Sequence, residues 1–170
     1  PTLVPHPDRV AIRNTARFLL SNLSGFDPAL HAVPVESMLA LDRWAIKRTA
    51  VLQKDIIAAY ENYQFHIIYQ KLHNFCAVDL GGIYLDIIKE LQYTMQADSL
   101  GRRSCQTALY HIIEAMTRWL APILSFTAEE LWKEIPGARS GTVFTAEWYA
   151  LPATAANEEI SNDDWAEIFS

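Results

Sequence analysis

Apolar residues recur at three- and four-residue steps along residues 99–132. The recurring positions are Cys105, Leu109, Ile112, Met116, Leu120 and Ile123. This is the period of a helix that buries one face, so the stretch predicts a long amphipathic helix. Asp98 or Ser99 can cap its start, because both side chains accept the free amide protons of a first turn. Pro122 lacks an amide proton and therefore bends or ends the helix near Leu120.

A second, shorter helix is predicted just beyond that proline. Thr127, followed three residues later by Glu130, fits a capping box, in which the two side chains bond backbone amides reciprocally. This position also explains the carboxylate pair Glu129 and Glu130 without a catalytic role. Pro136 and the glycine after it end the short helix. The chain is thus predicted to form a helix, a break and a helix, with a hydrophobic corner at residues 122–126.

Three further helical periods precede this region. The predicted helices span residues 8–23, 35–63 and 65–76. Tyr63 falls on the inward face of the second of these helices. Gly81 and Gly82 each cost a helix about 1 kcal/mol relative to alanine. We therefore expect a kink or a restart of the helix at these two glycines.

The C-terminal part of the chain has a different character. Residues 142–149 are rich in β-branched and aromatic side chains and predict an extended strap, with Phe144 and Trp148 packed onto the helices. The fold class is therefore predicted to be all-α: an antiparallel bundle of four to five helices with an extended C-terminal strap. We expect the bundle to occupy residues 1–150, and residues 151–170 to form a linker and the start of a following region.

The composition is that of a globular protein, since 51% of the 170 residues are apolar and 20% are charged. No apolar run reaches the ~20 residues that cross a bilayer, and the start carries no signal-peptide pattern, so we expect no membrane partner. Cys76 and Cys105 lie in apolar helical stripes and are expected to be buried free thiols, which fits a reducing cytoplasm. Because Pro1 opens the chain without a methionine, we expect a fragment of a longer protein.

The net charge of −6 and the pI of about 5.3 argue against nucleic-acid binding by the whole surface. Phosphate contacts need only a local basic cluster, however, and two clusters are present. Arg9, Arg13 and Arg17 follow one another by a helical turn, as a phosphate-binding ridge or as a solvated face. Arg102 and Arg103 stand in a first helical turn, where cations oppose the helix dipole, so either an anionic ligand or a nearby acid is expected there. Five polar residues of the long helix face away from its apolar stripe: Arg103, Thr107, His111, Glu114 and Arg118.

The residues that metal binding or catalysis needs are not arranged in a recognisable motif. His73 and Cys76 are three residues apart and His66 lies two turns earlier, but no second Cys/His pair completes four ligands. Neither a glycine-rich phosphate loop nor a Gly-x-Ser-x-Gly elbow occurs. We therefore expect no catalytic residue, no metal and no cofactor in this chain alone.

Four segments resemble one family. Residues 102–132 read RRSCQTALYHIIEAMTRWLAPILSFTAEELW, and shorter matches are IRNTARFLL at 12–20, YLDIIK at 84–89 and VFTAEW at 143–148. Together they resemble the anticodon-binding helical domain of class I aminoacyl-tRNA synthetases of the isoleucyl type, over roughly residues 8–149. The valyl, leucyl and methionyl types share this kind of domain. The combination of TALYHI with YLDIIK favours the isoleucyl type.

The resemblance implies a function for the helical bundle. In this family, the domain holds the anticodon stem and loop of the isoleucine tRNA, and the whole cytoplasmic enzyme joins isoleucine to that tRNA using ATP and magnesium. The two amino-acid activation motifs of class I enzymes, HIGH and KMSKS in one-letter code, do not occur here, and the family's zinc module lies outside this chain. The partners implied are therefore the tRNA and the remaining domains of a parent enzyme, with Arg9, Arg13, Arg17, Arg102 and Arg103 as candidate tRNA contacts.

Two alternatives remain beside this interpretation. The chain could be a helical protein-interaction module whose grooves bind another domain, or the equivalent domain of a valyl- or leucyl-type enzyme. Salt separates the first alternative from tRNA binding, because binding to nucleic acid weakens steeply as the salt concentration rises, whereas binding in an apolar groove does not.

Overall fold

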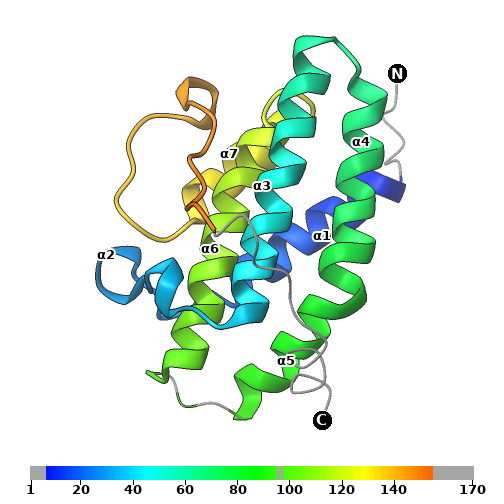
Figure 1. Cartoon of the computed structure of the whole chain (residues 1–170). Helices are drawn as coiled ribbons and strands as arrows, with labels where there is room; N and C mark the ends of the chain where they lie inside the picture. Colours follow the sequence, from blue (N-terminus) through cyan, green and yellow to red (C-terminus); the bar gives the residue numbers. More distant parts are fainter. Residues whose placement is uncertain (1–6, 95, 97, 155–170) are drawn as a thin grey trace.

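The computed structural model describes residues 7–94, 96 and 98–154, and their regular structure is entirely helical. The α-helices are α1 (Pro7–Ser21), α2 (Pro28–His31), α3 (Ala40–Glu61), α4 (Phe65–Asn74), α5 (Leu85–Thr94), α6 (Leu100–Leu120) and α7 (Ser125–Glu134). A π-helix (Phe75–Tyr84) joins α4 to α5, and short 3-10 turns occupy Val35–Ser37 and Val143–Thr145. Figure 1 shows α3 and α4 side by side, with α1 crossing behind them and the strap on one flank. The all-α bundle predicted from the sequence is confirmed.

Helix α6 is the centre of the molecule and is covered on nearly all sides. Its predicted stripe is buried, with Leu109, Ile112 and Met116 fully inaccessible to solvent. The opposite face carries the polar residues predicted there, and two of them, Thr107 and Glu114, are buried as well. They are covered by segments far away in the sequence: the amide of Val33, for example, donates to Thr107 Oγ1 at 3.0 Å.

The predicted ends of α6 are confirmed, whereas the predicted start of α7 is wrong. The Ser99 side chain accepts the amide proton of Arg102 as the cap of α6, and the helix ends at Leu120 before the proline. Helix α7 begins at Ser125 and has no side-chain cap, so the predicted capping box at Thr127 does not form. The two carboxylates of that sequence make long-range contacts instead: Glu129 accepts bonds from the strap, and Glu130 contacts α1.

The predicted helix over residues 35–63 is divided in the structure. Val35–Ser37 form a single 3-10 turn, Leu39 is extended, and α3 proper begins at Ala40. Tyr63 was expected on the inward face, but it lies beyond the helix with φ of 57° and is exposed. A tight turn in the left-handed region therefore reverses the chain into α4, which the helical period does not reveal.

The kink expected at Gly81 and Gly82 takes the form of the π-helix. A Cβ on Gly81 would stand 2.6 Å from the carbonyl oxygen of Cys76, five residues earlier, so the wide turn requires glycine here. A Cβ on Gly82 would meet nothing closer than 3.7 Å. The π-helix carries Tyr84 into the interior, where its hydroxyl donates to Asp42 Oδ1 at 2.7 Å.

The strap runs without regular structure on either side of its 3-10 turn, as predicted. Its packing differs from the prediction, because Val143 is the buried residue and Phe144 remains more than half exposed. Trp148 packs only in part, stacking on Tyr60 with 5.7 Å between ring centroids. The strap is held to α7 by Glu129, which accepts bonds from the Thr142 hydroxyl at 2.7 Å and the Val143 amide at 3.2 Å.

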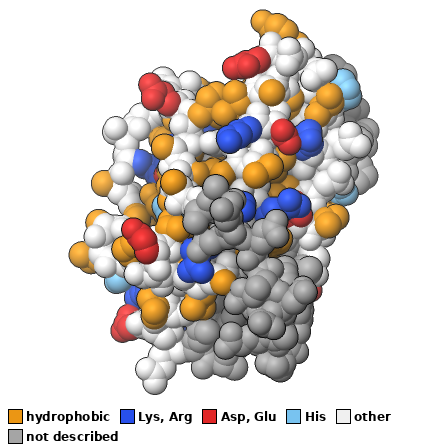
Figure 2. All heavy atoms as spheres, viewed as in Figure 1, with side chains coloured by type: hydrophobic (Ala, Val, Ile, Leu, Met, Phe, Trp, Pro, Cys, Tyr) orange, Lys and Arg blue, Asp and Glu red, His pale blue; other side chains and the backbone are white. Residues whose placement is uncertain are grey.

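On the face of the molecule seen in Figure 2, basic and acidic side chains are interspersed. Among the exposed ion pairs of the described residues, Arg48 pairs with Asp79 at 3.2 Å and Lys71 with Asp55 at 3.4 Å. None of the described helices combines the length and the apolar character that crossing a bilayer requires. Within the same residues, no group of three His, Cys, Asp or Glu side chains is placed to hold a metal ion.

Candidate nucleic-acid interface

The arginine ridge predicted from the sequence lies along one edge of α1. Its three members, Arg9, Arg13 and Arg17, follow one another by a turn, while Ile12 and Ala16 of the same helix are buried in the core. The side chains of Arg13 and Arg17 are 51% and 43% exposed, so their guanidinium groups are accessible from solvent. Because Ile12 and Ala16 pack into the core, the ridge on the other side of α1 lies on the surface.

A single carboxylate lies between two members of the ridge. Glu130 Oε2, from α7, is 3.1 Å from Arg17 Nη2 and 3.9 Å from Arg13 Nη2. Only the contact with Arg17 has the geometry of a hydrogen bond. All three groups are about half exposed, and ion pairs of this kind typically contribute between 0 and about 1 kcal/mol. Among the described residues, the ridge thus keeps an excess of positive charge, with Arg13 held more loosely than Arg17.

Two cation–π contacts fix the ends of the ridge. The Arg9 guanidinium lies 5.5 Å from the ring centre of Tyr69 in α4, and the Tyr69 hydroxyl donates to the carbonyl of Ile123 at 3.3 Å. The start of α1 is therefore close to the corner between α6 and α7. At the other end, Lys89 of α5 lies 5.4 Å from the ring centre of Phe18 and adds a further cation.

The structure separates the two arginines at the start of α6. Arg103 is largely buried, with 14% of its side chain exposed, and donates to Asp98 Oδ1 at 2.9 Å and the carbonyl of Gly25 at 3.1 Å. Asp98 thus pairs with the Arg103 guanidinium, and Arg103 stabilises the fold. The Arg102 guanidinium forms no ion pair or hydrogen bond within the described residues. Arg9 lies near the opposite end of α6, so the two clusters do not form one site.

Comparison with known proteins assigns most of the chain to one family. Residues 42–169 match the family described as the anticodon-binding domain of tRNA ligase. This match covers most of the chain. The chain belongs to this family of anticodon-binding domains. The matched residues include α3 to α7 and begin after α1, so the arginine ridge precedes them.

Individual relatives of this anticodon-binding domain are closely similar to it. The isoleucine–tRNA ligase of Nitrosococcus oceani is 64% identical over 160 residues, which is 94% of this chain and 17% of the relative. That of Saccharophagus degradans is 61% identical over 157 residues, 92% of this chain and 17% of the relative. The chain therefore spans about a sixth of the length of these relatives. The predicted resemblance to the isoleucyl type is confirmed.

Two residues of the anticodon-binding domain near the ridge were not predicted as site residues. The position of Lys89 beside the ridge could not be predicted, because Lys89 lies in a helix that is remote from α1 in the sequence. Phe126 was placed in a hydrophobic corner, where the sequence suggests burial, but it is 92% exposed in the first turn of α7. Neither position follows from local periodicity, because each depends on how separate helices meet.

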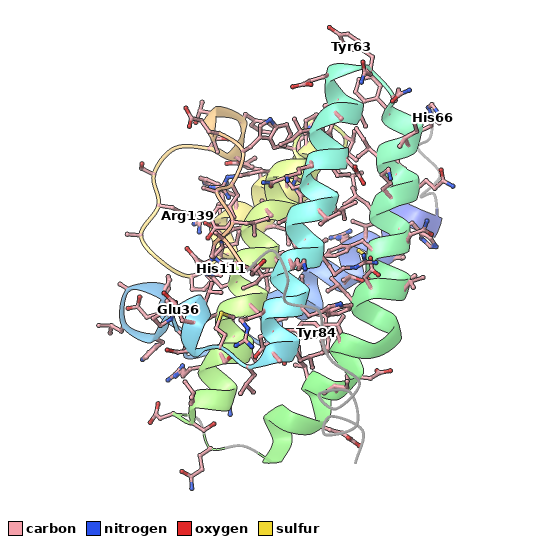
Figure 3. All side chains as sticks on the ribbon, in the orientation of Figure 1. Glu36, Tyr63, His66, Tyr84, His111 and Arg139 are labelled. Carbon is pink, nitrogen blue, oxygen red and sulfur yellow. The ribbon has the colours of Figure 1, made fainter. Side chains whose placement is uncertain are left out.

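The buried titratable groups of the domain serve the fold. Asp42 accepts bonds from Ser104 Oγ at 2.6 Å and Tyr84 Oη at 2.7 Å, while its burial raises the pKa of the carboxyl to about 6. Figure 3 shows Tyr84 behind the lower part of α3. Burial likewise raises the pKa of the Cys76 thiol to about 12, so this cysteine stays protonated and unreactive. Both cysteines are buried and free.

A second buried cluster holds the strap against α6. Arg139 Nη2 donates to Glu114 Oε1 at 2.6 Å, and the same guanidinium lies 4.6 Å from the ring centre of Trp132. His111 Nδ1 is 2.6 Å from the Tyr149 hydroxyl, and burial lowers the pKa of His111 to about 4. His111 and Arg139 both lie on the flank of α6 that faces the strap (Figure 3). These contacts stabilise the packing of the strap against α6.

Proposed function

We propose that this chain is the domain with which an isoleucine–tRNA ligase binds the anticodon stem and loop of its tRNA. The observation that carries the proposal is the match of residues 42–169 to the anticodon-binding family, together with relatives 61–64% identical that are named isoleucine–tRNA ligase. The domain contributes affinity and discrimination among tRNAs. The ATP-dependent joining of isoleucine, with its magnesium and zinc, belongs to other parts of the parent enzyme. Free, buried cysteines support a cytoplasmic location.

The ridge on α1 supports a mechanism for holding the RNA backbone. Arg13 and Arg17 present half-exposed guanidinium groups a helical turn apart, and guanidinium binds phosphate through charge-assisted hydrogen bonds. Glu130, the carboxylate beside Arg13 and Arg17, makes contacts that a phosphate can replace at little cost, because exposed ion pairs are weak. Arg13 is the first choice for a phosphate contact, since its separation from Glu130 is 3.9 Å.

Replacing Arg13 tests this assignment, and the chain offers a matched control. Arg13→Ala should weaken binding of an isoleucine tRNA transcript by about 1–2 kcal/mol, the range for a hydrogen bond to a charged group. It should also reduce the slope of log affinity against log salt concentration by about one, without changing the preference over a valine tRNA. Arg48→Ala is the control, because Arg48 is 50% exposed and paired with one acid at 3.2 Å, but lies off the ridge. Fluorescence anisotropy over a salt series gives both quantities.

Two results would contradict the assignment. Equal losses from Arg13→Ala and Arg48→Ala would mean that general charge, and not the ridge, attracts the RNA. A lowered melting temperature with unchanged tRNA affinity for Arg13→Ala would make Arg13 a structural ion-pair residue. Binding that is insensitive to salt in the unaltered chain would favour the protein-interaction alternative over tRNA binding.

A further inference from the structure

Phe126 is an apolar side chain that the fold leaves almost entirely in water. Its exposure of 92% is the largest among the big hydrophobic residues of the described part of the chain. Burying a phenylalanine typically contributes roughly 1.5–3 kcal/mol, and this fold gains almost none of it. Phe126 also has no capping role, because the N-cap residue of α7 is Leu124. Packing therefore gives no reason for an aromatic ring at this position.

The position of Phe126 relative to the ridge follows from two sets of contacts. Phe126 and Glu130 are four residues apart in α7, so their side chains are neighbours on one face of that helix. The carboxylate of Glu130 reaches the guanidinium groups of Arg13 and Arg17 in α1. An exposed aromatic ring therefore stands one helical turn from the point where α7 meets the basic ridge.

Tyr69 gives the second set of contacts. Its ring lies under the Arg9 guanidinium, and its hydroxyl donates to the carbonyl of Ile123, three residues before Phe126. The first turn of α7 and the first turns of α1 thus lie at the same end of the bundle, joined through α4. Phe126, Arg9 and Arg13 therefore lie near one another at this end of the bundle, although more than a hundred residues separate Phe126 from the two arginines in the sequence.

We propose that Phe126 is a stacking platform for an unstacked base of an RNA loop whose phosphates are held by Arg9, Arg13 and Arg17. This inference rests on the proposed function. Single-stranded bases bind proteins by stacking on aromatic rings, while cations beside the rings track the backbone. A ring and cations on one surface match the two chemical parts of a nucleotide. The ring supplies a flat contact that any base can use, so it adds affinity for a loop over a paired stem.

A comparison with the exposed aromatic rings of the strap supports this choice of ligand. Phe144 and Trp148 lie on the strap beside Arg118. The Arg118 guanidinium is largely buried and already bonded to the carbonyls of Glu147 at 2.9 Å and Glu114 at 2.7 Å. That group of rings therefore has no available cation beside it within the described residues. Phe126 differs because accessible arginines accompany it, which suits RNA and not a purely apolar partner.

The test compares three variants of this chain with two RNA probes. Phe126→Leu keeps the apolar bulk and removes the aromatic face, whereas Phe126→Trp keeps an aromatic face. Tyr63→Leu is the control, since Tyr63 is an 80% exposed ring that points away from the bundle at the tip of the turn between α3 and α4 (Figure 3). The probes are an isoleucine tRNA anticodon stem-loop and the same stem as a plain duplex without a loop.

Stacking of one base on an aromatic ring is worth roughly a 5- to 150-fold change in affinity. Phe126→Leu should therefore weaken stem-loop binding by roughly that factor and leave duplex binding and the salt slope unchanged. Phe126→Trp should stay within about threefold of the unaltered chain, and Tyr63→Leu should have no effect. Circular dichroism melting of each variant shows that the fold is retained, because an exposed side chain contributes little to stability.

Each remaining outcome overturns the inference. Stem-loop affinity of Phe126→Leu within twofold of the unaltered chain, with a normal salt slope, would refute the stacking role and leave the proposed function standing. Equal losses for the stem-loop and the duplex would also refute it, because a duplex offers no unstacked base. A lowered melting temperature with unchanged affinity would show that the ring serves the fold. Absence of any RNA binding by the unaltered chain would overturn the proposed function and this inference together.

Discussion

The buried carboxyl of Asp42 makes a quantitative prediction about stability and pH. Asp42 is 3% exposed and lies between Ser104 and Tyr84, both of which donate to it. Desolvation outweighs these two bonds and raises the pKa of the carboxyl from 3.8 to about 6. The folded protein therefore takes up a proton at a pH where the unfolded chain does not. Asp42→Asn removes this titration and keeps the shape of the side chain.

The sign and size of the effect follow from the two pKa values. A folded-state pKa that is raised gives a stability contribution that is complete below pH 3.8 and is lost as the pH rises through 6. Each unit of pKa difference corresponds to 1.36 kcal/mol, so the full contribution is roughly 3 kcal/mol. About 2 kcal/mol of it should be present at pH 4.5 and almost none at pH 7.5.

Urea unfolding of the native chain and of Asp42→Asn between pH 7.5 and pH 4.5 measures this contribution. The useful quantity is the difference between the two unfolding free energies at each pH, because His111 and other groups titrate equally in both proteins. This difference should shift by about 2 kcal/mol in favour of the native chain as the pH falls. Parallel curves, with a difference that stays constant over the range, would show that Asp42 is not protonated on folding and would refute the reasoning.

Two further predictions concern the π-helix and the strap. Gly81→Ala should lower the unfolding free energy by about 1–3 kcal/mol in thermal melts, because its Cβ would lie 2.6 Å from the Cys76 carbonyl oxygen. Gly82→Ala is the control and should be neutral or stabilising, because its Cβ would lie 3.7 Å from the nearest atom, the Ala77 carbonyl oxygen. The pKa of His111 is lowered from 6.5 to about 4, so the stability that its neutral ring provides above pH 6.5 is lost as the pH falls toward 4. His111→Gln should remove this loss in acid unfolding measurements, and an unchanged acid sensitivity would contradict it.

The elements that local chemistry determines could be predicted from the sequence. Ser99 caps α6 because its side chain accepts a nearby amide proton, and Pro122 ends the helix because it lacks a proton to donate. The capping box at Thr127 was wrong for a similar local reason. The observed N-cap is Leu124, whose carbonyl accepts from the Ala128 amide, so α7 begins three residues earlier than the capping box implies.

Features that depend on distant segments could not be predicted. The polar residues of α6 have the period of an exposed face, yet Thr107 is covered by the chain at Val33 and Glu114 by Arg139. The residues of the candidate site likewise include some that could be predicted from the sequence and some that could not. The spacing of the α1 arginines was visible in the sequence, whereas the bonds of Arg103 to Asp98 and to the distant Gly25 carbonyl were not. No periodic pattern contains that information.

The central place of α6 has a consequence for the synthesis of the protein. Helices α1, α2, α3, α5 and α7 all pack on α6, which occupies residues 100–120 of the 170. A nascent chain that has emerged only as far as α5 therefore lacks the helix against which all of these elements pack. At 5–20 residues per second, the hundred residues between the end of α1 and the end of α6 take roughly 5–20 s to make. Until then α1 and α3 can pack on α4 and the π-helix, but their residues that face α6 stay uncovered, so the core is completed only when the third quarter of the domain has been made.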